Sequence, residues 1–340
     1  MATMTMVMER QETDTAVVAM KAIVGERYGR PDVLELREVE PPQPTDDQVL
    51  VRVHASSVNP ADWYGVTGFL FARMGNGLRR PKVTAAGSDV AGRVEAVGAG
   101  VTTLRPGDEV FGTATGAWAE LACARESRIA PKPPGVSFAE AAAAPIAGCT
   151  ALQALRDHGR VERGQKVLIN GASGGVGTYA VQLAKALGAR VTAVCSSRNV
   201  DLVRSLGADR VVDYTAEDFT RIGEQHDLLL DIAGSRSLGA LQRVLAPDAA
   251  VVVIGGPMTY RGLGPLPHLG ATLVMSKLRR RAVRFFVAKI ERDDLAYLAS
   301  LLEAGTISSV IDRTYSLEQV PDALAHLGEG HARGKLVVTV

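Results

Sequence analysis

The chain has 340 residues, more than one hydrophobic core usually contains, so we expect two domains. Its 38 Lys and Arg residues nearly balance 37 Asp and Glu residues, and a net charge of +1 provides no overall field for nucleic acid or anionic lipid. A small, roughly neutral partner fits this balance better. The three cysteines, Cys123, Cys149 and Cys195, are far apart and form no Cys-x-x-Cys pair, which argues against a disulfide framework and a structural zinc site.

The first residues of the chain lack the pattern of an export signal. No apolar run reaches the roughly 18 residues that span a bilayer, and the N-terminal segment lacks the basic-then-apolar order of a signal peptide. We therefore expect a cytoplasmic protein that binds neither membranes nor nucleic acid. Residues 1–19 show no clear hydrophobic period and are expected to form a loose extension.

Residues 20–145 have the character of a β-rich domain. Short apolar runs separated by Gly and Pro are typical of all-β structure, and they lie at residues 49–53, 90–97, 109–112 and 119–122. The first of these runs leads into the stretch SSVNPADWYG, which contains Asn59, Asp62, Trp63 and Tyr64. This stretch brings amide, carboxyl and aromatic groups together without a neighbouring Cys or His.

After Pro145 the pattern changes to alternating strands and helices, which predicts a parallel, doubly wound sheet. The expected strands are residues 166–170, 190–194, 210–212, 228–231 and 250–254, with a sixth at 283–287. A helix at 293–304, a strand near Val310, a helix at 317–327 and a strand at 335–340 follow. We interpret this tail as a return to the first domain.

The strongest motif is the glycine-rich run that follows the predicted strand 166–170. In this run Ser173, Gly174, Gly175, Val176 and Gly177 precede an amphipathic helix. Glycines permit a tight turn and close approach of the backbone to a pyrophosphate, and a helix N-terminus attracts phosphate. The strand before the run and the helix after it are the context that this motif requires, so we predict a dinucleotide-binding site.

The end of the second strand of this sheet predicts which dinucleotide binds. A site for NAD usually has Asp or Glu here to hold the ribose hydroxyls, whereas this chain has Ser196, Ser197 and Arg198. Two hydroxyls and a guanidinium match a 2′-phosphate, so we predict NADPH as the cofactor. Gly255 and Gly256 follow the fifth strand, at the carboxyl edge of the sheet where such ligands bind.

Four segments together resemble the medium-chain dehydrogenase/reductase superfamily, and within it the zinc-independent quinone oxidoreductase branch. They are GSDVAGRVEAVGAGV (87–101), RPGDEVFG (105–112), the glycine-rich run and the terminal GKLVVTV. The resemblance implies an α/β protein with a GroES-like β-rich catalytic domain (20–145 and 289–340) and a Rossmann domain (146–288). The active site would lie in the cleft between them, and Tyr214 would lie near the adenosine.

The resemblance also gives a meaning to the SSVNPADWYG stretch. Zinc-dependent relatives have a Cys ligand near the position of Asn59 and a Gly-His-Glu run where this chain has Gly87, Ser88 and Asp89. No metal site is therefore expected, and hydrogen-bond donors have to replace the Lewis acid. By resemblance Asn59 and Tyr64 line the nicotinamide and substrate pocket, and an amide or phenol there would stabilise enolate charge. Trp63 is interpreted as an apolar wall of the substrate pocket, and Asp62 as a local hydrogen-bond anchor.

We therefore expect an NADPH-dependent, metal-free reductase that transfers hydride to a quinone or to an α,β-unsaturated carbonyl. Direct carbonyl or alcohol redox chemistry without zinc is one alternative. A dinucleotide-binding protein with a non-redox, structural or sensing role is another, and the presence of Asn59 and Tyr64 favours an enzyme over it. Residues 257–284 are expected to shape the pocket, and the edge strand 283–287 is expected to pair across a twofold axis in a homodimer.

Overall fold

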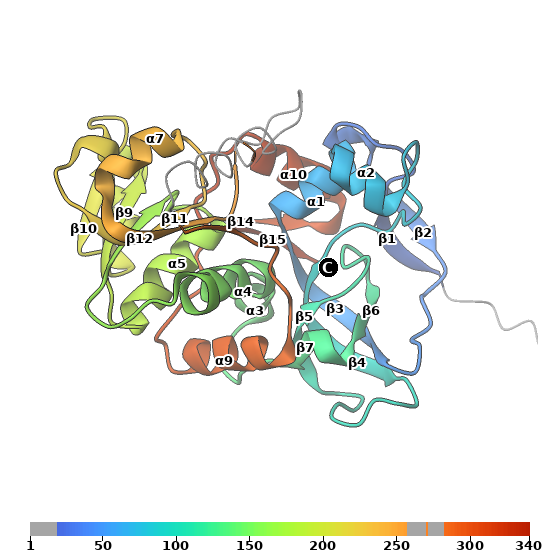
Figure 1. Ribbon diagram of the computed structural model, residues 1–340. Helices are drawn as coiled ribbons and strands as arrows, with labels where there is room; N and C mark the ends of the chain where they lie inside the picture. Colours follow the sequence, from blue (N-terminus) through green and yellow to red (C-terminus); the bar gives the residue numbers. More distant parts are fainter. Residues whose placement is uncertain (1–18, 257–269, 271–281) are drawn as a thin grey trace, which may run out of the picture.

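The computed structural model describes residues 19–256, 270 and 282–340. The expected extension, apart from Ala19, and most of the segment 257–284 lie outside the described residues. Figure 1 shows two sheets on opposite sides of the molecule, with helices between them. The chain is a mixed α/β protein, as the alternation of its apolar runs predicts.

The sheet at the left of Figure 1 has six strands, and every pair of neighbours in it is parallel. Its order is β10-β9-β8-β11-β12-β13. The strands are β8 (Lys166–Asn170), β9 (Arg190–Cys195), β10 (Arg210–Asp213), β11 (His226–Asp231), β12 (Leu245–Val253) and β13 (Val283–Phe285). The order runs outward in both directions from β8, so the switch point of this doubly wound sheet lies between β8 and β11.

The sheet at the right of Figure 1 is mostly antiparallel and contains the end of the chain. Its order is β14-β15-β3-β4-β5-β7, and β6 pairs with β3. The strands are β3 (Gln48–Val58), β4 (Asp89–Val97), β5 (Glu109–Thr113), β6 (Leu121–Arg125), β7 (Ile129–Pro131), β14 (Ile311–Ser316) and β15 (Lys335–Thr339). A small sheet pairs β1 (Met20–Val24) with β2 (Glu35–Val39). The last two strands, β14 and β15, thus return to the sheet that contains β3, near the start of the chain.

Helices cover both sheets and fill the space between them. The α-helices are α1 (Pro60–Thr67), α2 (Leu70–Asn76), α3 (Phe138–Ala142), α4 (Pro145–Gln153), α5 (Gly175–Ala186), α6 (Val200–Ser205), α7 (Leu238–Leu241), α9 (Arg292–Glu303) and α10 (Val320–Gly328). Helices α3 and α4 are rich in Ala, and the small side chains at 141–144 have no exposed surface. They belong to a core that includes residues of both sheets. The domain limits at 145/146 and 288/289 stay a prediction, because this core is shared.

Strand register explains the surroundings of Asn59. In the antiparallel pair of β15 and β3, Leu336 lies opposite Val58, so Lys335 comes beside the residue that follows β3, which is Asn59. In the neighbouring pair, Ser57 lies opposite Asp89. The ends of three strands therefore bring an amide, a carboxyl and an ammonium group together at the head of α1.

Candidate active site

The glycine-rich run forms the turn from β8 into α5. Gly171 has a φ of +96°, in the left-handed region that favours glycine. A Cβ on Gly177 would lie 2.1 Å from the carbonyl oxygen of Gly171, so only glycine fits here. No side chain caps α5 at Gly174, which leaves first-turn N–H groups for a phosphate. These features fit the pyrophosphate of a dinucleotide.

Buried Asn199 fixes the polar side chains beside this turn. Its Nδ2 donates to Ser173 Oγ at 2.9 Å and to Ser196 Oγ at 3.3 Å, which joins the glycine-rich run to the end of β9. Tyr214 is 49% exposed and follows β10, so its ring is accessible near this edge. Gly255 and Gly256 are partly buried just beyond β12, at the same edge of the sheet.

A carboxylate that the sequence pattern did not reveal lies beside the predicted phosphate site. The Ser197 hydroxyl donates to Asp213 Oδ2 at 2.6 Å, and this hydrogen bond lowers the pKa of Asp213. Asp213 ends β10, the strand next to β9, so sequence spacing from the glycine-rich run did not identify it. Arg198 is exposed, and its guanidinium donates to the carbonyl of His331 at 2.6 Å. The predicted site therefore contains both signs of charge.

Asn59 lies at the head of α1 and is only 2% exposed. Its Nδ2 donates to Asp89 Oδ2 at 2.9 Å, and its Oδ1 accepts from Lys335 Nζ at 2.5 Å. The cation and the carboxylate thereby fix the orientation of the amide, with its oxygen toward Lys335 and its nitrogen toward Asp89. Lys335 Nζ also donates to Val58 O at 3.2 Å and to Asp89 Oδ2 at 3.4 Å. Burial lowers the pKa of Lys335, and the nearby carboxylates oppose that shift.

The backbone next to Lys335 touches the glycine-rich run. Gly334 N donates to Ser173 O at 2.8 Å, and Gly334 forms an isolated parallel bridge with Gly174. A Cβ on Gly175 would lie 2.9 Å from Cδ of Lys335. The side chain of Lys335 therefore extends from the predicted pyrophosphate site to the amide of Asn59. Sequence reasoning used the GKLVVTV tail only as a family signature and missed this role.

Trp63 and Tyr64 occupy different environments on α1. Trp63 has no exposed surface and packs in a core cluster with Ile23, Leu34 and Trp118. This burial favours a packing role over the expected wall of the substrate pocket, and that role in the pocket stays a prediction. Tyr64 is half-buried and packs edge-on against Trp63, with ring centroids 5.4 Å apart. Burial raises the pKa of Tyr64, so its phenol stays protonated and can donate a hydrogen bond.

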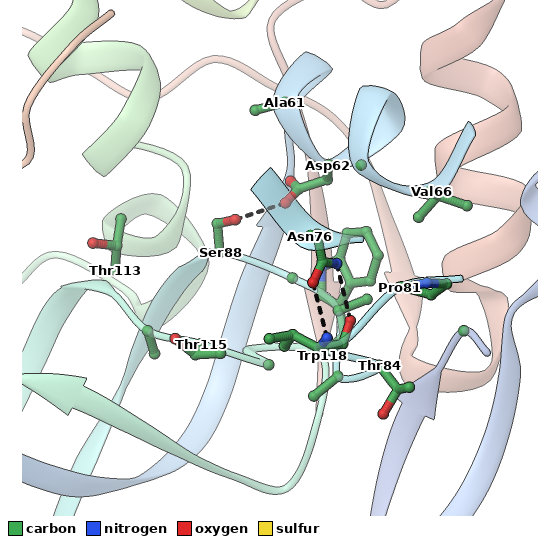
Figure 2. A pocket seen from close by; sticks show the side chains of 18 of the residues that line it. Ala61, Asp62, Val66, Asn76, Pro81, Thr84, Ser88, Thr113, Thr115 and Trp118 are labelled. Carbon is green, nitrogen blue, oxygen red and sulfur yellow. Dashed lines mark hydrogen bonds between the residues drawn. The ribbon is translucent and has the colours of Figure 1, made fainter. Parts of the chain in front are cut away.

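A cavity of about 630 Å³ lies beside α1. Figure 2 shows Asp62 of α1 and Ser88, which precedes β4, pointing toward one another in its wall. The Ser88 hydroxyl donates to Asp62 Oδ1 at 2.7 Å. Ile146 of α4 and Ile290 also line the cavity, so segments from both parts of the chain enclose it. Asn59, Trp63 and Tyr64 are not among the lining residues, although Tyr64 lies beside lining Ala61 on the helix surface.

Asp62 is an anchor, as expected, and is also strongly perturbed. Its Oδ2 accepts from the backbone N–H of Asn59 at 2.9 Å, across the first turn of α1. Asp62 is 8% exposed, and burial raises its pKa to about 6 against the opposing hydrogen bond from Ser88. A carboxyl group with a pKa near neutrality in a cavity wall can both hold and release a proton.

Comparison with known proteins identifies the family. The model of the alcohol dehydrogenase GroES-like domain matches residues 45–154, and that of the zinc-binding dehydrogenase matches residues 206–338. A quinone oxidoreductase from Triphysaria versicolor, named QR1, chloroplastic, is 35% identical and covers 94% of this chain and 98% of its own length. The chain belongs to the medium-chain dehydrogenase/reductase superfamily. It is quinone oxidoreductase-like within it, as the sequence motifs predict.

Two further relatives describe the range of this superfamily. The 2-methylene-furan-3-one reductase of Solanum lycopersicum is 34% identical over 96% of this chain and 81% of its own length. The structure of the quinone oxidoreductase from Coxiella burnetii superposes with a TM-score of 0.83 at 31% identity, covering 95% of this chain and 99% of that one. These relatives support an oxidoreductase enzyme with a GroES-like part and a Rossmann-like sheet.

The described residues contain neither a cluster of metal-binding side chains nor a membrane-spanning helix. Within these residues no three His, Cys, Asp or Glu side chains group in a way that could hold a metal ion. No helix in this described part of the chain is long and apolar enough to cross a membrane.

Proposed function

We propose that the protein is a zinc-independent, NADPH-dependent reductase that transfers hydride to a quinone or to the β-carbon of an α,β-unsaturated carbonyl. The observation that carries the proposal is the position of Lys335. Its side chain packs on the glycine-rich run, and its ammonium bonds the amide of Asn59. A dinucleotide on that run would have its nicotinamide directed toward this buried pair. The names of the quinone and furanone reductases among the relatives support both acceptor classes.

The residues present fit a nicotinamide dinucleotide. The uncapped start of α5 would hold the pyrophosphate. The phosphate on the ribose would be bound by Ser196, Ser197 and Arg198, and the adenine would contact Tyr214. When bound, the cofactor supplies the hydride. The phenol of Tyr64 would donate to the oxygen where enolate charge develops, and Asn59 would assist with the second hydrogen of its amide.

The donor set around Asn59 supports zinc independence. The ammonium of Lys335 lies 2.5 Å from Asn59 Oδ1 and 3.4 Å from Asp89 Oδ2, and this cation repels a second cation at the same oxygens. The three groups therefore do not fit Zn²⁺, for which thiolate, imidazole and carboxylate are the usual ligands. A small-molecule substrate, a cytoplasmic location and a homodimer complete the proposal.

A substrate panel tests the proposal directly. Purified protein is mixed with quinones, enones and aldehydes, each with NADPH or NADH, and the absorbance of the reduced cofactor is followed. We expect turnover of a quinone or an enone, with NADPH preferred, and no loss of activity after treatment with a chelator. Turnover of aldehydes alone would favour the carbonyl and alcohol oxidoreductase alternative. Stoichiometric zinc whose removal abolishes activity would contradict the metal-free mechanism.

A negative panel has a distinct meaning. Dinucleotide binding without turnover of any acceptor would favour the structural, sensing or non-redox alternative. Fluorescence titration with the reduced cofactor separates that outcome from a protein that has simply failed to fold.

A further inference from the structure

The proposed reductase needs a proton as well as a hydride. Transfer of hydride to an enone or quinone leaves the electron pair on the acceptor as an enolate or quinolate, and this anion has to be protonated. Tyr64 would stabilise that charge, but its raised pKa makes the phenol a poor acid at neutral pH. The wall of the cavity contains a better proton donor for this anion.

The pair of Ser88 and Asp62 has the geometry of a short proton relay. Both residues line the cavity, and Ser88 is the more exposed of the two. Ser88 Oγ is 2.7 Å from Asp62 Oδ1, a distance at which a proton can pass between the two oxygens. The other carboxyl oxygen, Oδ2, accepts from the N–H of Asn59, so the carboxyl group is fixed relative to the serine.

We infer that Ser88 and Asp62 deliver the proton that completes reduction of the acceptor, a step that rests on the proposed function. The Ser88 Oγ–H bond breaks as its proton passes to the enolate or quinolate. When Asp62 is protonated at Oδ1, the hydrogen bond with Ser88 reverses, so that the carboxylic acid donates to Ser88 Oγ and the Ser88 O–H is free to face the acceptor. The carboxylic acid gives its proton to Ser88 Oγ in the same step and becomes a carboxylate. A proton from solvent in the cavity then restores the acid. The acceptor thus gains one hydride and one proton in total, and the oxidised cofactor carries the complementary change.

Burial affects the protonation of Asp62 more than the charges that face it. Asp89 of β4 raises the pKa of Asp62, and Lys335 of β15 lowers it, but both effects are smaller than that of burial. Asn59 and Ser88 add hydrogen bonds that favour the carboxylate. The side chains of Arg27, Arg125 and Arg128 contribute positive charge to the cavity lining. With a pKa of about 6, Asp62 is still protonated in part of the molecules near neutral pH, and these molecules can donate the proton.

Four variants test the relay. Ser88→Ala removes the hydroxyl, and Asp62→Asn keeps the shape of the side chain but cannot supply the proton. Ser88→Thr keeps a hydroxyl at the same position. Ser56→Ala is the matched control, because Ser56 is a buried serine that donates to the backbone oxygen of Asp89 at 2.6 Å and does not line the cavity.

We expect Ser88→Ala and Asp62→Asn to lower kcat by about 10- to 100-fold, the low end for general acid catalysis, because cavity water can partly replace the relay. NADPH affinity should not change. In the native enzyme kcat should fall as pH rises through the pKa of Asp62, and Asp62→Asn should lose that dependence. Ser88→Thr should recover most of the rate, and Ser56→Ala should keep the native pH profile. A solvent isotope effect on kcat should accompany the relay.

Infrared spectroscopy gives a measurement that does not depend on turnover. A protonated carboxyl band should titrate near pH 6 in the native protein, shift in Ser88→Ala and disappear in Asp62→Asn. Native rates in both variants, or an unchanged band in Asp62→Asn, would overturn the relay and leave the reductase proposal in place. If no compound of the substrate panel is reduced, the proposed function is contradicted. The catalytic role of the relay is then contradicted as well.

Discussion

Asn59 and Tyr64 differ in exposure, because Asn59 is buried and Tyr64 is half-buried. The amide of Asn59 is engaged by Asp89 and Lys335, whereas Tyr64 is half-buried beside the cavity-lining Ala61. The phenol is therefore the better placed direct donor, and Asn59 depends on its surroundings for orientation. The two substitutions should have different consequences.

Tyr64→Phe keeps the ring and removes only the hydroxyl. We expect kcat/KM to fall by about 10-fold or more, up to the 10² to 10³ that is typical for loss of a main oxyanion donor. NADPH affinity, measured by fluorescence titration, should stay unchanged because the group acts on developing charge. Asn59→Ala should lower kcat/KM and also reduce stability, since it removes one buried hydrogen-bond partner from each of Lys335 and Asp89. Full activity in both variants would show that the pair only packs.

We expect the choice of cofactor to depend on two opposite charges, those of Arg198 and Asp213. Arg198→Ala should weaken NADPH binding by about 1–3 kcal/mol, the scale of a charge-assisted contact, and affect NADH little. Asp213→Asn should strengthen NADPH binding, because it removes an anion that bonds Ser197 beside the expected phosphate. Titration of each variant with both cofactors measures these differences. Equal affinity of the native protein for NADPH and NADH would contradict the prediction.

At the scale of the element, two helices share a motif in which a carboxylate reaches back to the residue before the helix. In α3 the carboxylate of Glu140 accepts from Ser137 N at 2.9 Å, and the Ser137 hydroxyl lowers the pKa of Glu140. In α1 the carboxylate of Asp62 accepts from Asn59 N at the same distance, but burial raises its pKa to about 6. The hydrogen bond lowers the pKa in both helices, but burial outweighs it at Asp62, so the two carboxyl groups contribute in opposite ways to the pH dependence of stability.

Asp62→Asn tests this difference. The unfolded pKa of Asp is near 3.9, so the folded protein binds more protons between about pH 4 and pH 6. The contribution of this group is fully present below about pH 4 and is lost as pH rises through about 6. In the native protein, Asp62 should lower the free energy of unfolding by on the order of 2 kcal/mol as pH rises from 4 to 7. The Asp62→Asn variant should lack this decrease. Urea unfolding at several pH values measures it.

Glu140→Gln is the matched control. The Glu140 carboxylate stabilises the folded protein above its unfolded pKa, and this contribution is lost as pH falls through its lowered folded pKa. Glu140→Gln should therefore lose stability mainly at neutral pH. An Asp62→Asn protein whose stability depends on pH as the native protein does would show that Asp62 is not protonated near pH 6.

Prediction from sequence succeeded where local pattern decides the structure. Strand β8 was placed at its observed bounds, because an apolar run before a glycine-rich turn is a local signal. The two residues that complete the surroundings of Asn59 were missed. Lys335 is 276 residues away in the chain, and Asp89 reaches Asn59 only through the pairing of β3 with β4. Such contacts depend on register, which single-sequence patterns do not specify. The burial of Trp63 was missed for the same reason.

At the scale of the whole molecule, β13 is one of the two edge strands, with β10, of the six-stranded sheet formed by the described residues. It was expected at residues 283–287 and is found at Val283–Phe285, paired with β12 on one side. Phe285 is 47% exposed and Val287 is 80% exposed beyond it. An open edge with exposed apolar side chains is a template for pairing with a second chain, and a twofold axis closes such an assembly.

We expect the protein to have twice its chain mass of 35.9 kDa in solution. The double variant Phe285→Lys, Val287→Lys should shift it to the monomer, because charged side chains on an edge strand oppose pairing. Met74→Lys is the control, since Met74 is also exposed, at 74%, but lies on α2, outside the six-stranded sheet. Light scattering at micromolar concentration measures the mass. A native monomer would rule out the dimer, and a dimer that survives the double variant would place the interface on another surface.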